Sequence, residues 1–167
     1  MSGQTSAADT KARQIWKLLE AGEIQQATVM CQQLHRSFPD YAEGWHVASH
    51  VAERARLPGK SLEFIQRAVH LHPDNCGYSM QHAAVLHRIG RGTEGSRVAR
   101  QLIGREQPSA AAYNLLGSTL ARFDFHEDAL EAIEKAIALD NSRADYQFNR
   151  AAELRFLGRL ADAEDAC

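Results

Sequence analysis

Residues 110–143, "AAAYNLLGSTLARFDFHEDALEAIEKAIALDNSR", contain two apolar-periodic segments separated by a short polar break. The first segment carries a small residue, Gly117, at its centre. The second places Ala129, Ile133 and Ala136 on one face at the spacing of an α-helix. Acidic residues lie near the start of the second segment, where the helix dipole favours them. The stretch therefore predicts two helices joined by a tight turn.

The same pattern recurs every 34 residues along the chain. Steps of 34 from Gly117 and from Ala129 give two columns of mainly small residues, whereas the columns through Leu120 and Ile133 are apolar. Two antiparallel helices approach closely only where side chains at their crossing are small, so the small columns predict the crossing point of each helix pair. A repeat of this length is typical of a solenoid, in which neighbouring units bury each other's apolar faces. The two small columns are Ile15, Ser49, Ala83, Gly117, Ala151 and Ala27, Ser61, Gly95, Ala129, Ala163.

Each unit has a break between its two predicted helices. Glycine tolerates the left-handed conformation that ends many helices, and Gly22, Gly90 and Gly158 stand at this place in three units. Arg56 and Asp124 occupy it in the other two.

Composition and net charge narrow the class of protein. The chain has 167 residues, 44% of them hydrophobic and 24% charged, which is ordinary for a soluble globular protein. The net charge of −2 argues against a nucleic-acid partner, because such proteins need excess Lys and Arg. No apolar run approaches the roughly 20 residues of a membrane span, and no signal peptide is visible. The three cysteines lack metal or redox spacing, so we expect a cytoplasmic protein without a cofactor.

Charge is distributed unevenly along the chain. Residues 42–122 contain ten Lys and Arg against six Asp and Glu, together with six of the eight histidines. Residues 123–167 contain five Lys and Arg against eleven Asp and Glu. Such a field can orient a partner, but it does not determine the fold.

The 34-residue pattern resembles the tetratricopeptide repeat (TPR). The aromatic Tyr113, the Leu116–Gly117 pair, Leu120 and the spaced alanines of residues 110–143 carry this resemblance. It implies an all-α fold, a right-handed superhelical solenoid of antiparallel helix pairs with about 4.7 repeats. We expect a disordered leader over residues 1–7 and an array over residues 8–167, with units 8–41, 42–75, 76–109, 110–143 and a truncated unit 144–167.

The resemblance also implies where a ligand would bind. In this family the first helices of successive units line a concave surface that binds extended peptides. Gln81 and Asn149 occupy an adjacent place whose amides bind the peptide backbone in some members. No nucleophile–base constellation or phosphate loop is present, so the sequence predicts a non-enzymatic scaffold for a protein or peptide partner. The candidate groove residues are His46, His50, Arg54, Gln81, His87, Arg88, Asn114, Ser118, Arg122, Phe148, Asn149 and Arg155.

Arg54, Arg88 and Arg122 recur at the same place in three units and allow two interpretations. They could form a cationic row that receives carboxylates of an acidic peptide. Alternatively, each arginine simply lies at the end of a first helix, where the dipole favours a cation. The lysine and asparagine clamp with which chaperone-tail binders of this family hold a terminal carboxylate is absent.

Three further features suggest alternative roles. His46 and His50 are four residues apart on one helix face, so they could hold a metal or titrate within the groove, although no third ligand is evident. Phe148 and Phe156 could anchor a partner side chain or contact further chain. Cys31 is expected to pack as a small hydrophobe, whereas Cys76 lies near a helix start that could activate its thiol.

The last unit stops after about two turns of its second helix. Arrays of this family usually end with a polar capping helix, so we expect either further chain beyond Cys167 or self-association through the uncapped end. The stretch "DYQFNRAAELRFLGRLADAEDA", residues 145–166, is similar to repeats that precede a sulfotransferase-like domain in some bacterial proteins. The alternative function is therefore a recruiting arm of a larger enzyme. RNA reading by helical hairpins is disfavoured by the acidic balance.

Overall fold

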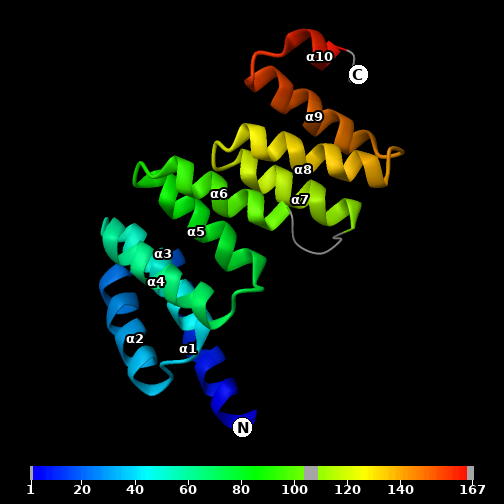
Figure 1. Ribbon diagram of the computed structural model, residues 1–167. Coiled ribbons are helices and arrows are strands. Elements are labelled where there is room, and N and C mark those ends of the chain that lie inside the picture. Colours follow the sequence, from blue (N-terminus) through cyan, green and yellow to red (C-terminus); the bar gives the residue numbers. More distant parts are fainter. Residues whose placement is uncertain (1, 104–108, 165–167) are drawn as a thin grey trace. The chain divides into compact units, whose positions relative to one another are not determined.

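The computed structural model describes residues 2–103 and 109–164, and every regular element within them is an α-helix (Figure 1). The chain divides into two compact units, Met1–Arg91 and Gly92–Cys167. Within each unit, neighbouring helices pack against each other in pairs, as the 34-residue pattern predicts.

The described residues of unit 1, from 2 to 91, form five helices. The leader that we expected to be disordered is helical from Ser2 on, because α1 runs through residues 2–7 without a break. Its apolar stripe Ala8, Ala12, Ile15 and Leu19 is buried. The helices of unit 1 are α1 (Ser2–Glu20), α2 (Ile24–Ser37), α3 (Ala42–Arg54), α4 (Pro58–Leu71) and α5 (Cys76–Arg88).

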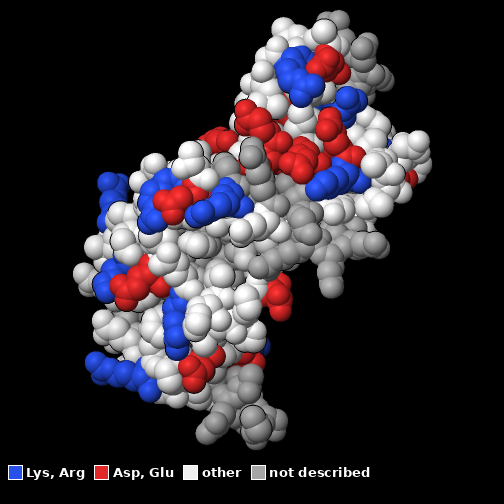
Figure 2. Space-filling view, viewed as in Figure 1, with Lys and Arg blue, Asp and Glu red and all other residues white. Residues whose placement is uncertain are grey.

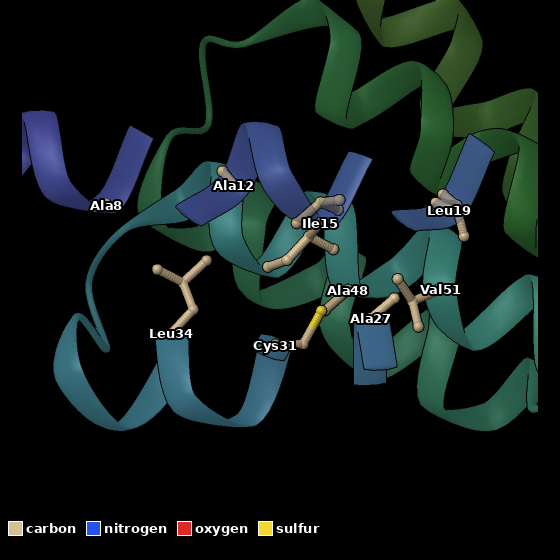
Figure 3. Packing of buried hydrophobic residues seen from close by; sticks show 10 residues of the cluster. Ala8, Ala12, Ile15, Leu19, Ala27, Cys31, Leu34, Ala48 and Val51 are labelled. Atoms are coloured by element: carbon tan, nitrogen blue, oxygen red, sulfur yellow. The ribbon is translucent and has the colours of Figure 1, made fainter. Parts of the chain in front are cut away.

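One hydrophobic core cluster of unit 1 lies between α1, α2 and α3 (Figure 3), where Ile15 and Leu34 are completely buried. Val47 belongs to the same cluster and is also completely buried. Cys31 belongs to the same cluster, and burial raises the pKa of its thiol to about 12. A thiol that stays protonated is a poor nucleophile, so the prediction that Cys31 packs as a small hydrophobe is confirmed.

The helices of the α3–α4 pair cross at two buried serines. The hydroxyl of Ser49 lies 2.9 Å from the hydroxyl of Ser61 and 3.1 Å from its carbonyl oxygen. Both residues belong to the predicted small columns. Their size allows the two backbones to approach, and the hydrogen bonds satisfy polar groups that burial removes from water.

The predicted breaks adopt the left-handed conformation. Gly22 and Gly90 have φ values of 78° and 81°, and Arg56 and Asp124 reach 57° and 61° without being glycines. After α3, the amide of Leu57 donates to the carbonyl of Ala52 at 2.8 Å, which closes the last turn. The turn geometry therefore recurs even where the residue type departs from the pattern.

The described residues of unit 2, 92–103 and 109–164, form five helices. Leu120, Ala129, Ile133 and Leu154 are buried in it. A Cβ atom on Gly117 would lie 3.0 Å from the carbonyl oxygen of Ala129, which confirms the predicted crossing of α7 and α8. The helices of unit 2 are α6 (Gly92–Ile103), α7 (Ala110–Ala121), α8 (His126–Leu139), α9 (Ala144–Phe156) and α10 (Leu160–Glu164).

The acidic balance of the C-terminal part appears on the surface of unit 2. Figure 2 shows acidic side chains in the region of α8, whose exposed acids are Glu127, Glu131 and Glu134. The sequence also predicts that Ala151 meets Ala163 at the crossing of a helix pair. The side chain of Ala163 lies outside the part of the chain that the structure describes.

Candidate functional site

One face of α3 carries an alternating row of two carboxylates and two imidazoles. Glu43, His46, His50 and Glu53 follow each other at spacings of three, four and three residues, which places them on one helix face. His46 Nδ1 lies 3.1 Å from Glu43 Oε2, and the Nε2 atoms of His46 and His50 are 3.3 Å apart. His50 Nδ1 lies 3.5 Å from Glu53 Oε2. The row is therefore a continuous chain of polar contacts along the helix.

Helices α1 and α5 attach to the Glu43 end of this row. The indole of Trp16 on α1 donates to Glu43 Oε1 at 3.0 Å, and the hydroxyl of Tyr78 on α5 donates to Glu43 Oε2 at 3.1 Å. The Trp16 ring centre lies 5.7 Å from that of His46 and 5.0 Å from that of His50. Helices α1, α3 and α5, each the first helix of its repeat, thus meet at one polar and aromatic cluster.

At the other end, Glu53 accepts hydrogen bonds from two side chains of α5. Gln81 Nε2 donates to Glu53 Oε2 at 3.0 Å, and the guanidinium of Arg88 pairs with Glu53 Oε1. Arg88 keeps nearly half of its side chain exposed. Its charge is therefore already matched by a carboxylate of the same chain.

The network keeps both carboxylates ionised. Burial alone would raise the pKa of Glu43, but hydrogen bonds from His46, Trp16 and Tyr78 outweigh it and leave the pKa below its usual value. The pKa of Glu53 is likewise lowered, because its bonds with His50, Arg88 and Gln81 outweigh burial. Burial and the neighbouring Glu43 raise the pKa of Tyr78.

The structure brings together four of the candidate residues of unit 1, His46, His50, Gln81 and Arg88, and bonds them to one another or to Glu53. Gln81 is buried and its amide donates to Glu53, and its expected role toward a ligand stays a prediction. The remaining candidates of unit 1 lie at helix ends, with Arg54 exposed as the last residue of α3 and His87 half-buried near the end of α5.

Unit 2 presents a different face. Asn149 Nδ2 on α9 donates to Asn114 Oδ1 on α7 at 2.9 Å and lies 3.5 Å from the hydroxyl of Ser118. Phe148, the neighbour of Asn149, has 74% of its surface exposed. This face offers amide groups beside an uncovered aromatic ring.

The other predicted positions of unit 2 lie at the ends of helices. Arg122 is the exposed residue that ends α7, and Arg155 is exposed in the last turn of α9. Phe156 is 73% exposed, although its ring stacks on His126 with centres 4.6 Å apart. His126 in turn lies 2.7 Å from Glu153, which is buried.

Tyr78 was not among the predicted site residues, and the sequence pattern alone does not single it out. Tyr78 contacts Glu43 at a sequence separation of 35 residues, Arg88 contacts Glu53 at the same separation, and so does Asn149 with Asn114. These three contacts between first helices of neighbouring repeats span one repeat length plus one residue, whereas the contacts of Trp16 with Glu43 and of Gln81 with Glu53 span 27 and 28 residues.

No group of three or more His, Cys, Asp or Glu side chains in the described part of the chain is arranged to hold a metal ion. His46 and His50 accordingly lack a third ligand there. No helix among the described residues combines the length and apolar character needed to cross a membrane.

The chain is similar to known proteins in fold but matches none of them closely in sequence. No protein-family model and no curated protein sequence matches the chain. MamA 41-end from Desulfovibrio magneticus RS-1 is 18% identical, with a TM-score of 0.63 over 95% of this chain and 90% of that one. Pseudomonas aeruginosa PilF is 17% identical, with a TM-score of 0.66 over 98% and 75%. YrrB, described as a TPR protein with an unusual peptide-binding site, is 14% identical, with a TM-score of 0.59 over 98% and 88%.

Similarity at this level of identity shows the fold. The predicted fold class is confirmed: the chain is all-α, and its antiparallel helix pairs form a TPR-like solenoid.

Proposed function

We propose that the protein is a non-enzymatic scaffold of the tetratricopeptide-repeat family that binds an extended segment of a partner protein along the faces of its first helices. The observation that carries the proposal is the exposed ring of Phe148 beside the Asn149–Asn114 amide pair. The similarity to solved structures of TPR-like fold supports it, and one of these, YrrB, is described as having a peptide-binding site.

The amide pair has the chemistry to bind a peptide backbone. The amide nitrogen of Asn149 donates to Asn114 Oδ1. Within the described part of the chain, Asn149 Oδ1 and Asn114 Nδ2 make no hydrogen bond. One of these groups accepts and the other donates, as do the N–H and C=O of a peptide group. Phe148 alongside would cover an apolar side chain of the bound segment, because aromatic residues contribute much of the binding energy at such sites.

Unit 1 supports a partner segment of mixed or acidic character. An acidic segment would have to displace Glu53 from Arg88 before it could pair with the guanidinium. An ion pair of this exposure is worth about 0.2–1 kcal/mol, so the competition is mild. Cytoplasmic localisation, self-association through the C-terminal end and a sulfotransferase-like domain beyond Cys167 stay predictions.

The proposal is tested by affinity capture with the full-length protein and with two variants, Phe148→Ala and Asn149→Ala. The matched control is Leu139→Ala, because Leu139 is 60% exposed but lies at the end of a second helix, α8. The proposal would be supported by partners that bind the wild type and the control but neither of the two site variants. Identical partner sets for all four proteins, with unchanged circular dichroism, would refute it.

The charge of the partner is tested at Glu53. Glu53→Gln leaves the shape nearly unchanged and removes one carboxylate that pairs with Arg88. Binding of an acidic partner segment should tighten by about two- to fivefold, which corresponds to the loss of one half-exposed ion pair. Arg88→Glu, alone or with Arg122→Glu, should weaken the same binding. Equal affinity of both variants and wild type would show that the arginines only stabilise helix ends.

A further inference from the structure

A pocket of about 230 Å³ lies in unit 1 between α2 and α4, and α3 forms its floor. The floor is made largely of alanines, with Ala48 and Ala52 in α3 and Ala55 directly after it. Alanine leaves open the space that a larger side chain would fill. An apolar cavity of about 150 Å³ already holds a benzene molecule. The pocket therefore has room for one aromatic ring with a short chain.

An aromatic corner forms part of the pocket wall. His35 from α2 and Phe64 from α4 both line the pocket, and their ring centres lie 5.7 Å apart at an angle of 63°. His35 stacks on Trp45 with ring centres 3.6 Å apart, and its Nε2 lies 3.2 Å from the carbonyl oxygen of Gly44. A ring that enters the pocket meets this corner, and aromatic pairs are favourable beyond the area they bury.

Cys31 from α2 adds a buried polar group without a protein partner. It lines the pocket and is 5% exposed, and among the described residues its thiol makes no hydrogen bond. Figure 3 shows its sulfur pointing toward Ala48 of the pocket floor. Sulfur makes favourable contacts with aromatic rings. The thiol is therefore a second, independent indication of a ring-bearing ligand.

The charge of the pocket favours an anion. Burial outweighs the hydrogen bond to Gly44 and lowers the pKa of His35, so this ring is neutral at pH 7. Among the described lining residues, Lys60 then has the one full charge, and its side chain is 57% exposed. Lys60 Nζ lies 2.8 Å from Glu63 Oε2, but Glu63 is itself 60% exposed, and ion pairs of this exposure are weak. A second carboxylate can therefore share Lys60.

We propose that the pocket between α2 and α4 binds a small aromatic carboxylic acid. The ring lies against Phe64, His35 and the thiol of Cys31, and the carboxylate pairs with Lys60. All of these residues belong to unit 1, whereas the partner site proposed above lies in unit 2. The two proposals therefore stand or fall separately.

The test uses the full chain and two probes with the same skeleton, 3-phenylpropionate and its neutral analogue 3-phenylpropanol. Methyl ¹H–¹³C NMR follows Val51 and Leu57, which both line the pocket. We expect both methyl signals to shift when the acid is added, and the acid to bind about two- to fivefold more tightly than the alcohol. Unchanged Val51 and Leu57 signals at millimolar acid, or equal dissociation constants for the two probes, would overturn the proposal.

Two variants separate the charge from the space. In Lys60→Gln the acid should lose its advantage over the alcohol. Lys135→Gln is the matched control and should keep it, because Lys135 also pairs with a glutamate and also lies 5.9 Å from an aromatic ring centre, but in unit 2. Ala55→Leu places a larger side chain at the half-buried floor and should abolish binding of both probes. Wild-type affinities in Ala55→Leu with unchanged circular dichroism, or an equal loss in both lysine variants, would contradict the proposed site.

Discussion

Gly117→Val tests the close approach of α7 and α8 from which the fold was predicted. A Cβ atom at this position would lie 2.6 Å from Ile133 Cγ1 and 3.0 Å from the backbone oxygen of Ala129. The isoleucine could turn away, but the backbone oxygen moves only if the helices separate. Overpacking of this kind costs about 1–3 kcal/mol, and valine regains only a few tenths over glycine in a helix. We expect the free energy of unfolding of unit 2 to fall by about 1–2.5 kcal/mol.

The measurement is urea unfolding followed by circular dichroism. Gly59→Val is the matched control, because Gly59 also lies in a helix but a Cβ atom there would meet no atom within 4 Å. The control should stay within about 0.5 kcal/mol of wild type. If Gly117→Val is as stable as Gly59→Val, the crossing does not depend on a small residue and the argument from the small columns is refuted.

Three further predictions concern stability. Ser49→Ala should lower the free energy of unfolding by about 1 kcal/mol in urea titrations, because it removes a buried hydrogen-bond partner of Ser61; no change would show that the pair contributes only its size. Arg56→Gly should raise the thermal midpoint, with a gain of about 0.5–1 kcal/mol, because the left-handed conformation costs a non-glycine residue more than glycine loses in chain entropy. Glu43 and Glu53 have lowered pKa values in the folded protein, so the stability they confer is complete above the ordinary glutamate pKa and is lost as pH falls through the folded values. Urea midpoints between pH 7 and pH 3 should therefore drop steeply in wild type and less in Glu43→Gln, whereas parallel curves would contradict the lowered pKa values.

The sequence predicts the helices and their crossings well because both depend on local rules. Gly22 and Gly90 end their helices as expected, and the small pair Ser49 and Ser61 meets at the crossing of α3 and α4. The leader is the exception. Residues 2–7 lack the repeat pattern, yet they continue the helix whose buried stripe begins at Ala8.

The candidate site was predicted less completely, because the repeat tells which residues face one side and not how they bond to one another. His46, His50 and Arg88 were identified as groove residues, but their contacts with Glu43 and Glu53 depend on side-chain rotamers. The spacing of 35 residues between bonded partners becomes visible only once helices of neighbouring units are placed side by side.

The arginine row is placed at helix ends by the structure. Arg54 and Arg88 are the last residues of α3 and α5, and Arg122 is the residue that ends α7. This position agrees with the dipole interpretation, and binding by the row stays a prediction that the Glu53→Gln and Arg88→Glu variants test.

The central claim is that a partner segment binds at Phe148 and Asn149. The most direct measurement is the dissociation constant of the captured partner segment for wild type, Phe148→Ala and Leu139→Ala, by fluorescence anisotropy. Covering a phenylalanine side chain is worth about 1.5–3 kcal/mol, so Phe148→Ala should weaken binding by roughly 10- to 100-fold while Leu139→Ala stays within about twofold. Equal dissociation constants for all three proteins would contradict the account.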